Sequence, residues 1–198
     1  MILSSQGVQS QKIIKKSILN PSTSFIQIDL ANCFKINLET RDTNEILVEA
    51  IIDGEYKEDL VLNIKEEGST ILISTGFQPS FVPPNDKLSA HKVVSISLKV
   101  FLPKYKKVQL YGTNCNVFAS GAYRNLKVSL NDGQCTLFRV SESVEVITQS
   151  GNIFVNSSGA TITANSKYGT VQREQLPSGG NQFKLNTTTG NIHIRKSD

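Results

Sequence analysis

The chain has 198 residues, of which 38% are hydrophobic, and a formal net charge of +4. This length suits one domain or two small ones packed together, and no apolar run approaches the length needed to cross a bilayer. Trp is absent, Ser, Thr, Asn and Gly are abundant, and no long helical period occurs, so we expect an all-β fold.

Residues 1–24 are expected to form an N-terminal tail. Val8 and Ser10, just before Gln11, give the small-residue pattern of a signal-peptide cleavage site, whereas the basic segment and most of the apolar segment of a signal peptide are missing. We interpret the tail as the remnant of a trimmed signal peptide. The protein is therefore expected to be secreted, periplasmic or exposed on the cell surface.

Residues 25–105 show the alternation of half-buried strands. Turn residues such as Asp53-Gly54 and Glu67-Gly68 separate the alternating runs, which favours an antiparallel meander. One connector, residues 75–91, is long and carries Phe77 and Phe81, so we expect a flap or a functional loop there. The predicted strands are 25–30, 34–38, 46–52, 60–64, 71–73 and 94–102.

A run of lysines between Lys87 and Lys107 contains no acidic residue. Such a run could attract a polyanion, but no nucleic-acid motif and no interleaved aromatic residues accompany it. Lysines on alternate strand positions are typical of a solvated face or a protected sheet edge. We therefore expect no nucleic-acid partner.

Residues 106–198 contain a repeat. Segments starting at Val108, Val128, Val146, Ala164 and Leu185 align at offsets of 20, 18, 18 and 21 residues, and each of the last four has a glycine before an alternating strand. Each unit reads as strand, glycine turn, strand, turn, where glycine gives access to positive φ. The pattern predicts that antiparallel N-terminal strands run into a narrow β-solenoid, or β-helix, with coils of 18–21 residues.

Stacking of these coils in chain order predicts three inward columns. A single coil cannot bury its own hydrophobic face, so the coils are expected to be stable only as one continuous stack. Arg173 interrupts the third column, which predicts a distorted fourth coil. The columns are Val108, Val128, Val146, Ala164 and Leu185; Cys115, Cys135, Ile153, Val171 and Ile192; and Val117, Leu137, Val155 and Ile194.

The motif Thr-x-x-Gly-Asn-Ile occurs at Thr148–Ile153 and again at Thr187–Ile192. Following an alternating N-terminal half with Leu102-Pro103 before the first coil, it resembles the bacterial putative-adhesin proteins of unknown function and the related head GIN domain proteins. The resemblance covers residues 25–198. It implies a secreted or envelope-attached all-β domain with an adhesive role and no catalytic residues to carry over.

The residues that could carry chemistry give mostly negative signals. Cys33, Cys115 and Cys135 lack Cys-x-x-Cys spacing, and we interpret them as small core residues rather than a disulfide or a metal pair. His91 and His193 are isolated in sequence, and the acid of Asp132-Gly133 is absent from the other turns, so we predict no metal and no cofactor.

An aromatic stripe is the best candidate for a binding site. Phe118, Phe138 and Phe154 are predicted to point outward from three adjacent coils, where sugar rings or a partner protein could pack against them. The alternative is that the first half of the chain covers the stripe as a second core layer. We expect this for Phe118 and Phe138, with Phe154 partly exposed.

Of three functions that fit these observations we favour the first, and we predict that the protein is not an enzyme; the other two are alternatives. The first is a non-catalytic, adhesin-like domain that presents a rigid β surface to a cell-surface glycan or an envelope protein. The second is a polysaccharide-active enzyme, whose carboxylate pair would be Glu142 and Glu145 across a turn. The third is a protein-interaction module of an envelope-stress system.

Overall fold

The computed structural model describes residues 11–54, 56–82 and 94–197, and the only helical element within these ranges is the 3-10 turn η1 (Lys57–Asp59). The expected all-β class is confirmed. The strands are β1 (Lys12–Ile18), β2 (Phe25–Asp29), β3 (Lys35–Arg41), β4 (Ile46–Gly54), β5 (Leu60–Glu67), β6 (Thr70–Phe77), β7 (Val94–Pro103), β8 (Lys107–Asn114), β9 (Asn116–Asp132), β10 (Cys135–Thr148), β11 (Ile153–Ser157), β12 (Thr161–Ser166), β13 (Val171–Arg173), β14 (Gln182–Thr187) and β15 (Ile192–Lys196).

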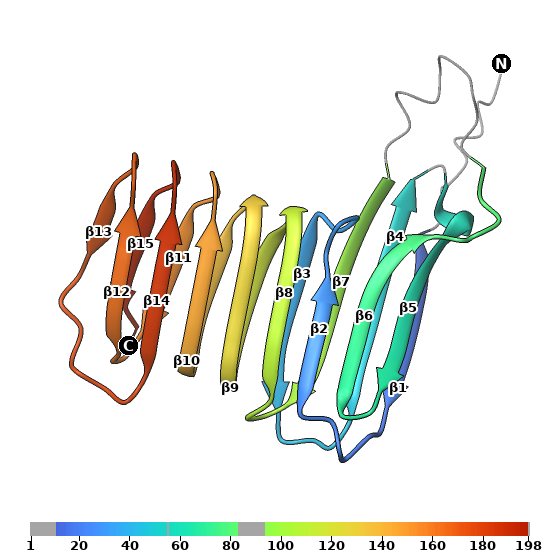
Figure 1. Ribbon diagram of the computed structural model, residues 1–198, viewed down its shortest axis with the longest axis horizontal. Helices are drawn as coiled ribbons and strands as arrows, with labels where there is room; N and C mark the ends of the chain where they lie inside the picture. Colours follow the sequence, from blue (N-terminus) through green and yellow to red (C-terminus); the bar gives the residue numbers. More distant parts are fainter. Residues whose placement is uncertain (1–10, 55, 83–93, 198) are drawn as a thin grey trace, which may run out of the picture.

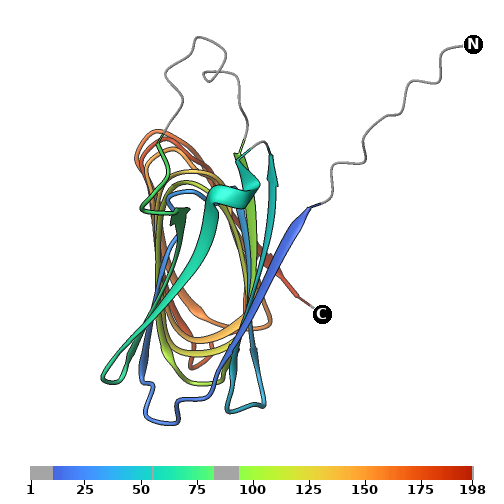
Figure 2. The ribbon, with the colours of Figure 1, turned by 90° about the vertical axis from the view of Figure 1, so that its right-hand side faces the viewer.

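The strands form two ladders that face each other across one hydrophobic core (Figure 1). The front ladder runs β5, β6, β2, β8, β9, β10, β14, β12, and the back ladder runs β1, β4, β7, β3, β9, β10, β11, β15, β13. The long strands β9 and β10 contribute their first halves to the back and their second halves to the front. Viewed end-on, the strands superimpose on an elongated ring (Figure 2). We call one passage through the front and then the back ladder a coil.

The N-terminal part differs from the expected tail and antiparallel meander. Lys12–Ile18 already forms a strand that pairs with β4, whereas the expected cleavage site at Val8 and Ser10 lies outside the described residues. Within the described ranges, antiparallel pairing is limited to β1–β4, β4–β7 and β5–β6, and β2 and β3 are parallel to both their neighbours. Alternation of apolar residues indicates which face is buried but not the direction of the neighbouring strand, so the sequence could not show this.

The order of the coils in space is not their order in the chain. The C-terminal coil β14–β15 lies between β10–β11 and β12–β13, so Leu185 pairs with both Val146 and Ala164. At the other end, β2 and β3 likewise lie between the β6 and β7 strands and the β8–β9 coil. The expected stacking in chain order is therefore wrong at the last two coils, and the expected boundary at residues 105/106 is crossed by two ladders.

The predicted columns are also shifted by two residues at the first coil. Val128 pairs with Leu110 rather than Val108, and Cys135 pairs with Val117 rather than Cys115. A shift of two residues leaves every side chain on the same face of the strand, so the apolar pattern cannot detect it. From Cys135 onward the columns pair as the alignment requires, apart from the exchanged order of the last two coils.

The aligned glycines allow close approach of neighbouring coils. Gly133 has a positive φ of 95°, as expected, but Gly151, Gly169 and Gly190 do not have positive φ. A Cβ atom at Gly151 would overlap the carbonyl oxygen of Gly133, and one at Gly190 would overlap that of Gly151. These glycines are thus required by contact between coils rather than by the turn conformation.

Hydroxyl groups of the repeated motif bind the same turns from inside. The Thr148 hydroxyl donates to the carbonyl oxygen of Gly151 at 2.7 Å, and the Thr187 hydroxyl of the next coil reaches the same oxygen at 3.3 Å. Ser166 of the outermost coil donates to the carbonyl oxygen of Gly190 at 2.7 Å. These contacts explain why threonine or serine precedes Gly151, Gly169 and Gly190 by three residues, because a buried polar group needs a partner.

The asparagine that follows Gly151 or Gly190 caps the next coil. Asn152 Oδ1 accepts a hydrogen bond from the backbone N–H of Asn191 at 2.7 Å, and Asn191 Oδ1 accepts one from Thr170 at 2.9 Å. Thr170 occupies the same position in the outermost coil, which has no further coil to cap. The two copies of the motif are therefore adjacent in space although a different coil separates them in sequence.

Candidate functional site

The outer surface of the back ladder carries a group of ring side chains that we call the aromatic face: Phe101, Phe118, Phe138, Phe154 and His193. Four of these rings lie between buried residues of their strands and Phe138 follows the buried Leu137, so the alternation that buries the core turns the rings outward. Register places Phe118, Thr136, Phe154 and His193 in one row across four strands, with Phe138 in the adjacent row. The aromatic face thus follows the stacking direction.

The rings of the aromatic face contact one another and two guanidinium groups. Phe118 and Phe138 stack with centroids 6.3 Å apart and planes inclined by 24°, and Phe154 stacks on His193 at 4.8 Å. The Arg41 guanidinium lies 3.5 Å from the centroid of Phe101, and that of Arg139 lies 5.3 Å from the centroid of Phe138. Such contacts fix the rings in place before any partner binds.

The described residues do not cover this face as expected. Phe118 is 38% exposed and Phe138 is 37% exposed, whereas Phe154 is half-buried. The expected covering residues lie elsewhere: Phe77 and Phe81 stack at 4.3 Å beside Tyr56, next to the end of β6 in the front ladder. Exposure of Phe118 and Phe138 contradicts the expectation of a second core layer. Residues 83–93 of the predicted flap, including His91, lie outside the described residues.

A groove of about 490 Å³ lies beside Phe118 and is lined with charged side chains. Arg41 Nε is 3.0 Å from Glu39 Oε1, and Lys99 Nζ is 3.5 Å from Glu49 Oε1. A hydrogen bond from Lys15 lowers the pKa of Glu49, so that carboxylate stays ionised. The groove therefore offers charged groups that are held in ion pairs, next to exposed ring surface; its lining is Asn37, Leu38, Glu39, Arg41, Lys99, Phe101, Phe118 and Ser120.

The sequence did not identify Phe101, Arg41, Lys99 or His193 as parts of this site. Alternation places each of them outward, which was the available signal. Their neighbourhood depends on β3 lying between β7 and β9, and on β15 lying next to β11. Both arrangements follow from the exchanged order of the coils, and local sequence patterns do not indicate this order.

The lysine run does not form a free basic patch where it is described. Lys104 pairs with Asp42 at 2.7 Å, Lys99 pairs with Glu49, and Lys106 donates to the carbonyl oxygen of Thr23 at 2.6 Å. Lys87 and Lys92 lie outside the described residues. Two carboxylates thus offset part of the charge of this run, which weakens its attraction for a polyanion.

The three cysteines are free and buried. Burial raises the pKa of Cys33 to about 11 and those of Cys115 and Cys135 to about 12, so the thiols stay protonated at neutral pH. A protonated thiol is a poor nucleophile and a poor metal ligand. This favours their interpretation as small core residues.

The two candidate carboxylates lie in different environments. Glu145 is held between Lys127 at 3.1 Å and Lys184 at 3.7 Å on the front ladder. Glu142 is exposed at a bulge of β10, with a φ of 75° and its backbone N–H bonded to Asn181 Oδ1. An ion-paired carboxylate suits a structural ladder better than it suits proton transfer.

Comparison with known proteins places the fold. Neither family models nor curated proteins match the sequence. The chain shares its fold with a putative cell adhesion protein from Clostridium sporogenes ATCC 15579, at a TM-score of 0.69. The two sequences are 13% identical, and the match covers 95% of this chain and all of the other. The TM-score shows a common fold, and the low sequence identity says nothing about shared site residues.

A second solved structure is less similar. A putative adhesin from Bacteroides fragilis NCTC 9343 matches with 11% identity over 96% of this chain and 99% of the other, at a TM-score of 0.40. That score is too low to carry an argument.

Within the described residues, the structure contains no helix that is long and apolar enough to span a membrane.

Proposed function

We propose that this protein is a non-catalytic, adhesin-like binding domain that recognises its partner through the aromatic face. The observation that carries the proposal is the exposure of Phe118 and Phe138 on a rigid sheet, because large apolar rings are left in water at a cost unless something covers them. The adhesion-related name of the protein that shares the fold supports this proposal. We also classify the parallel coils as a narrow β-solenoid of the putative-adhesin type.

A protein surface is the favoured partner of the aromatic face. Arginine and aromatic residues dominate the energetic centres of protein interfaces, and here Arg41 and Arg139 lie against Phe101 and Phe138. A glycan is the second candidate, because the stacked rings form a flat apolar strip on which sugars could pack. In both cases the place of action is the cell surface or the extracellular medium.

The non-catalytic character of the domain is part of the proposal. Glu145 is committed to two lysines, and the three thiols are protonated, so neither group is set up for acid–base or nucleophilic work. The test is incubation with a panel of neutral and acidic glycans. Product formation that disappears in the Glu142→Gln/Glu145→Gln double variant would refute this part.

The binding proposal is tested with Phe118→Ala/Phe138→Ala in a screen of immobilised glycans and purified cell-surface proteins. Loss of two central rings should weaken binding about tenfold or more, as expected for about 1.4 kcal/mol. Tyr168→Ala is the matched control, because Tyr168 is 70% exposed and lies in the turn before β13, at the end of the stack. Equal binding by the double variant and the control would overturn the aromatic face as the site.

A further inference from the structure

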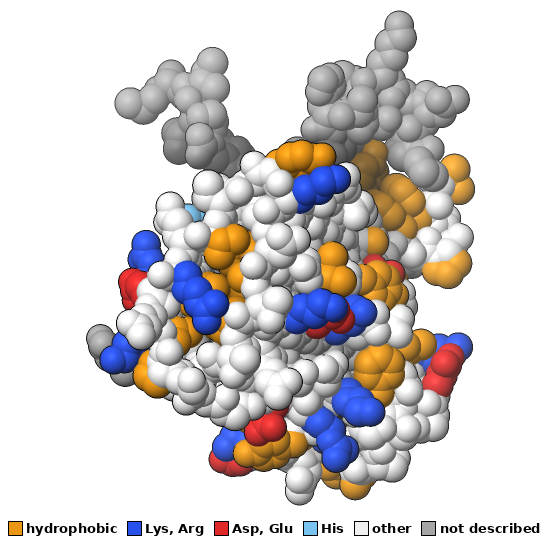
Figure 3. Space-filling view, turned by 60° about the vertical axis from the view of Figure 1, so that its left-hand side comes forward, with side chains coloured by type: hydrophobic (Ala, Val, Ile, Leu, Met, Phe, Trp, Pro, Cys, Tyr) orange, Lys and Arg blue, Asp and Glu red, His pale blue; other side chains and the backbone are white. Residues whose placement is uncertain are grey.

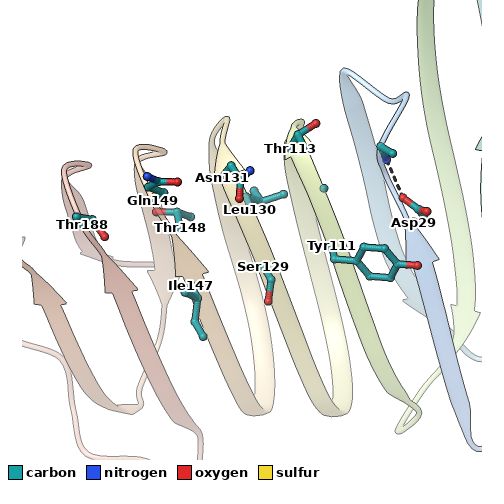
Figure 4. Close-up of a pocket in the computed structure, with 12 residues that line it drawn as sticks. Asp29, Tyr111, Thr113, Ser129, Leu130, Asn131, Ile147, Thr148, Gln149 and Thr188 are labelled. Atoms are coloured by element: carbon teal, nitrogen blue, oxygen red, sulfur yellow. Dashed lines mark hydrogen bonds between the residues drawn. The ribbon is translucent and has the colours of Figure 1, made fainter.

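A second groove lies on the opposite side of the molecule, along the front ladder just below the upper turns (Figure 4). It has a volume of about 580 Å³ and spans β2, β8, β9, β10 and the end of β14. Two rows of side chains border it, because the same positions recur in successive coils. The row beside the turns contains Ala31, Thr113, Asn131, Gln149 and Thr188, and the row below contains Asp29, Tyr111, Ser129 and Ile147.

Several polar side chains of this groove are not committed to the fold. Across the ranges 11–54, 56–82 and 94–197, five of them make no side-chain hydrogen bond: Thr113, Ser129, Asn131, Gln149 and Thr188. Other polar side chains of the turns and of the front ladder do have partners in the fold. Asn152 and Asn191 cap neighbouring coils, and Glu145 is paired with lysines. A row of free amides and hydroxyls, one in each of the four coils that contain Thr113, Asn131, Gln149 and Thr188, is therefore a feature of this groove.

The floor of the groove combines an aromatic ring with small and apolar residues. Tyr111 extends its ring toward β2, where its hydroxyl accepts a hydrogen bond from Gln27 Nε2 at 3.2 Å (Figure 4). Ser129 lies between Tyr111 and the 40% exposed Ile147, and its small side chain leaves the space that forms the groove. Asp29 uses only Oδ1, to accept from the Ala31 N–H at 2.9 Å, so its second oxygen remains available.

The chemistry of the lining selects one class of ligand. No lysine or arginine is among the lining residues, which disfavours a polyanion. A peptide that adds a strand needs free backbone groups, but the N–H groups of Leu30, Gln149 and Thr188 already bond to the next coil. A neutral sugar suits the site, because its ring can pack on Tyr111 and its hydroxyl groups can exchange hydrogen bonds with amides, hydroxyls and one carboxylate.

We propose that the front groove binds a neutral, extended glycan that lies along the stacking direction. Strands are spaced by about 4.8 Å, so the five coils at the groove present their polar groups over roughly 20 Å. Each sugar of an extended β-linked chain advances by about one strand spacing, so that successive sugars meet successive coils. The front groove is distinct from the aromatic face.

The surface around the stack is mixed in character. In the space-filling view, hydrophobic side chains form separate patches within a mainly polar surface (Figure 3).

The test uses the full chain and soluble neutral polysaccharides, namely a β-1,4-glucan, a β-1,4-mannan and an α-1,4-glucan, in affinity electrophoresis. Retardation by at least one β-linked polymer is expected. Ser129→Arg should abolish it by filling the groove, and Tyr111→Ala should weaken it about tenfold. Gln109→Ala is the control, because Gln109 precedes Tyr111 by two residues on the same face of β8 and lies outside the groove.

Thermal melting of each variant separates loss of binding from loss of folding, and the Phe118→Ala/Phe138→Ala variant separates this site from the aromatic face. The proposal requires that the double phenylalanine variant retains glycan binding. The proposal is overturned if neither β-linked polymer retards the protein, whether or not the α-1,4-glucan does, or if folded Ser129→Arg binds as the parent does.

Discussion

The two ends of the stack are closed in different ways. At the β1/β5 end, Lys12 donates to the carbonyl oxygens of Glu58 and Leu60, and Lys16 donates to that of Leu62, all within 3.2 Å. At the β12/β13 end, the corresponding contact is a single one, from Arg173 Nη1 to the carbonyl oxygen of Ile162 at 3.2 Å. Inward-pointing lysines are a known protection of sheet edges, whereas the second end relies on short edge strands.

Both ends nevertheless share one feature of chain path. At each end, two strands lie between segments that are not their neighbours in the chain: β2 and β3 at one end, and β14 and β15 at the other. The N-terminal strand β1 stays on the outer edge of the first end, whereas the C-terminal coil β14–β15 is an interior layer of the second end. Interior layers contribute more to stability than end layers, because they are covered on both sides.

Truncation after Gly180 should have the largest effect. It removes β14 and β15, and with them the buried side chains of Phe183, Leu185, Ile192 and Ile194. At about 1.5–3 kcal/mol for each, the loss is comparable with the whole stability of a domain. We expect the truncated chain to lose its cooperative thermal transition. If the C-terminal coil were instead an outer cap, the truncated chain would melt close to the parent.

The same charged substitution in one column should distinguish an interior coil from the end coil. Cys135 is fully buried and Val171 is 42% exposed, although both belong to the column that runs Cys135, Ile153, Ile192, Val171. Cys135→Asp should cost about 3–5 kcal/mol, because it leaves a buried charge unpaired or forces its neutralisation. Val171→Asp should cost under about 0.5 kcal/mol.

Urea unfolding of the two variants provides the comparison, with Cys135→Val as the control for side-chain shape. The control should be mild, because valine is apolar and close in size to cysteine. Equal losses for Cys135→Asp and Val171→Asp would show that the two positions are not at different depths in the stack.

Gly151→Ala tests the contact between interior turns. The added Cβ would overlap the carbonyl oxygen of Gly133, so neighbouring coils must separate, at a cost of about 1–3 kcal/mol. Gly180→Ala is the matched control, since a Cβ there meets nothing within 4 Å and the backbone does not have positive φ. Melting temperatures measure the difference. A variant of Gly151 as stable as that of Gly180 would contradict the close approach of the coils.

Asparagine caps should give the smallest difference. Asn191→Ala removes the acceptor for the Thr170 N–H and should cost about 0.5–1.5 kcal/mol. Thr170→Ala lies at the same turn position one coil farther out, where no coil needs a cap, so we expect a smaller cost. Chemical unfolding of both single variants and of the double variant tests this, because the Thr170 hydroxyl also bonds to Asn191 Oδ1.

The sequence indicated which face of each strand is buried, but it did not indicate which strands lie next to each other. The repeat spacing, the inward residues from Val128 onward and the outward position of Phe118 all follow from alternation and from the glycine register. Strand direction in the first half and coil order at both ends depend on long-range pairing. Loss of the capping asparagine is not by itself a signal of coil order, since Gln134 replaces it in an interior coil and Thr170 replaces it in the outermost coil.

The candidate sites could be predicted only in part, because the sequence did not show which strands lie next to each other. Phe118, Phe138 and Phe154 could be identified because they lie in consecutive repeats, whereas Phe101 and Arg41 come from strands that the sequence could not place beside them. The front groove was not predicted, because its residues are ordinary turn residues whose alignment matters only once the coils are stacked.

The exchanged order of the last two coils is tested most directly by disulfide formation between outward positions. Glu145 pairs with Lys184 in the register, whereas Thr163 lies one strand farther away. Neighbouring strands are about 4.8 Å apart, within the Cα range of a disulfide, and two strand spacings exceed it. Under oxidation, Glu145→Cys/Lys184→Cys should form an intramolecular disulfide, detected by mass spectrometry, and Glu145→Cys/Thr163→Cys should not. The reverse result would mean that the coils stack in chain order and would contradict the account.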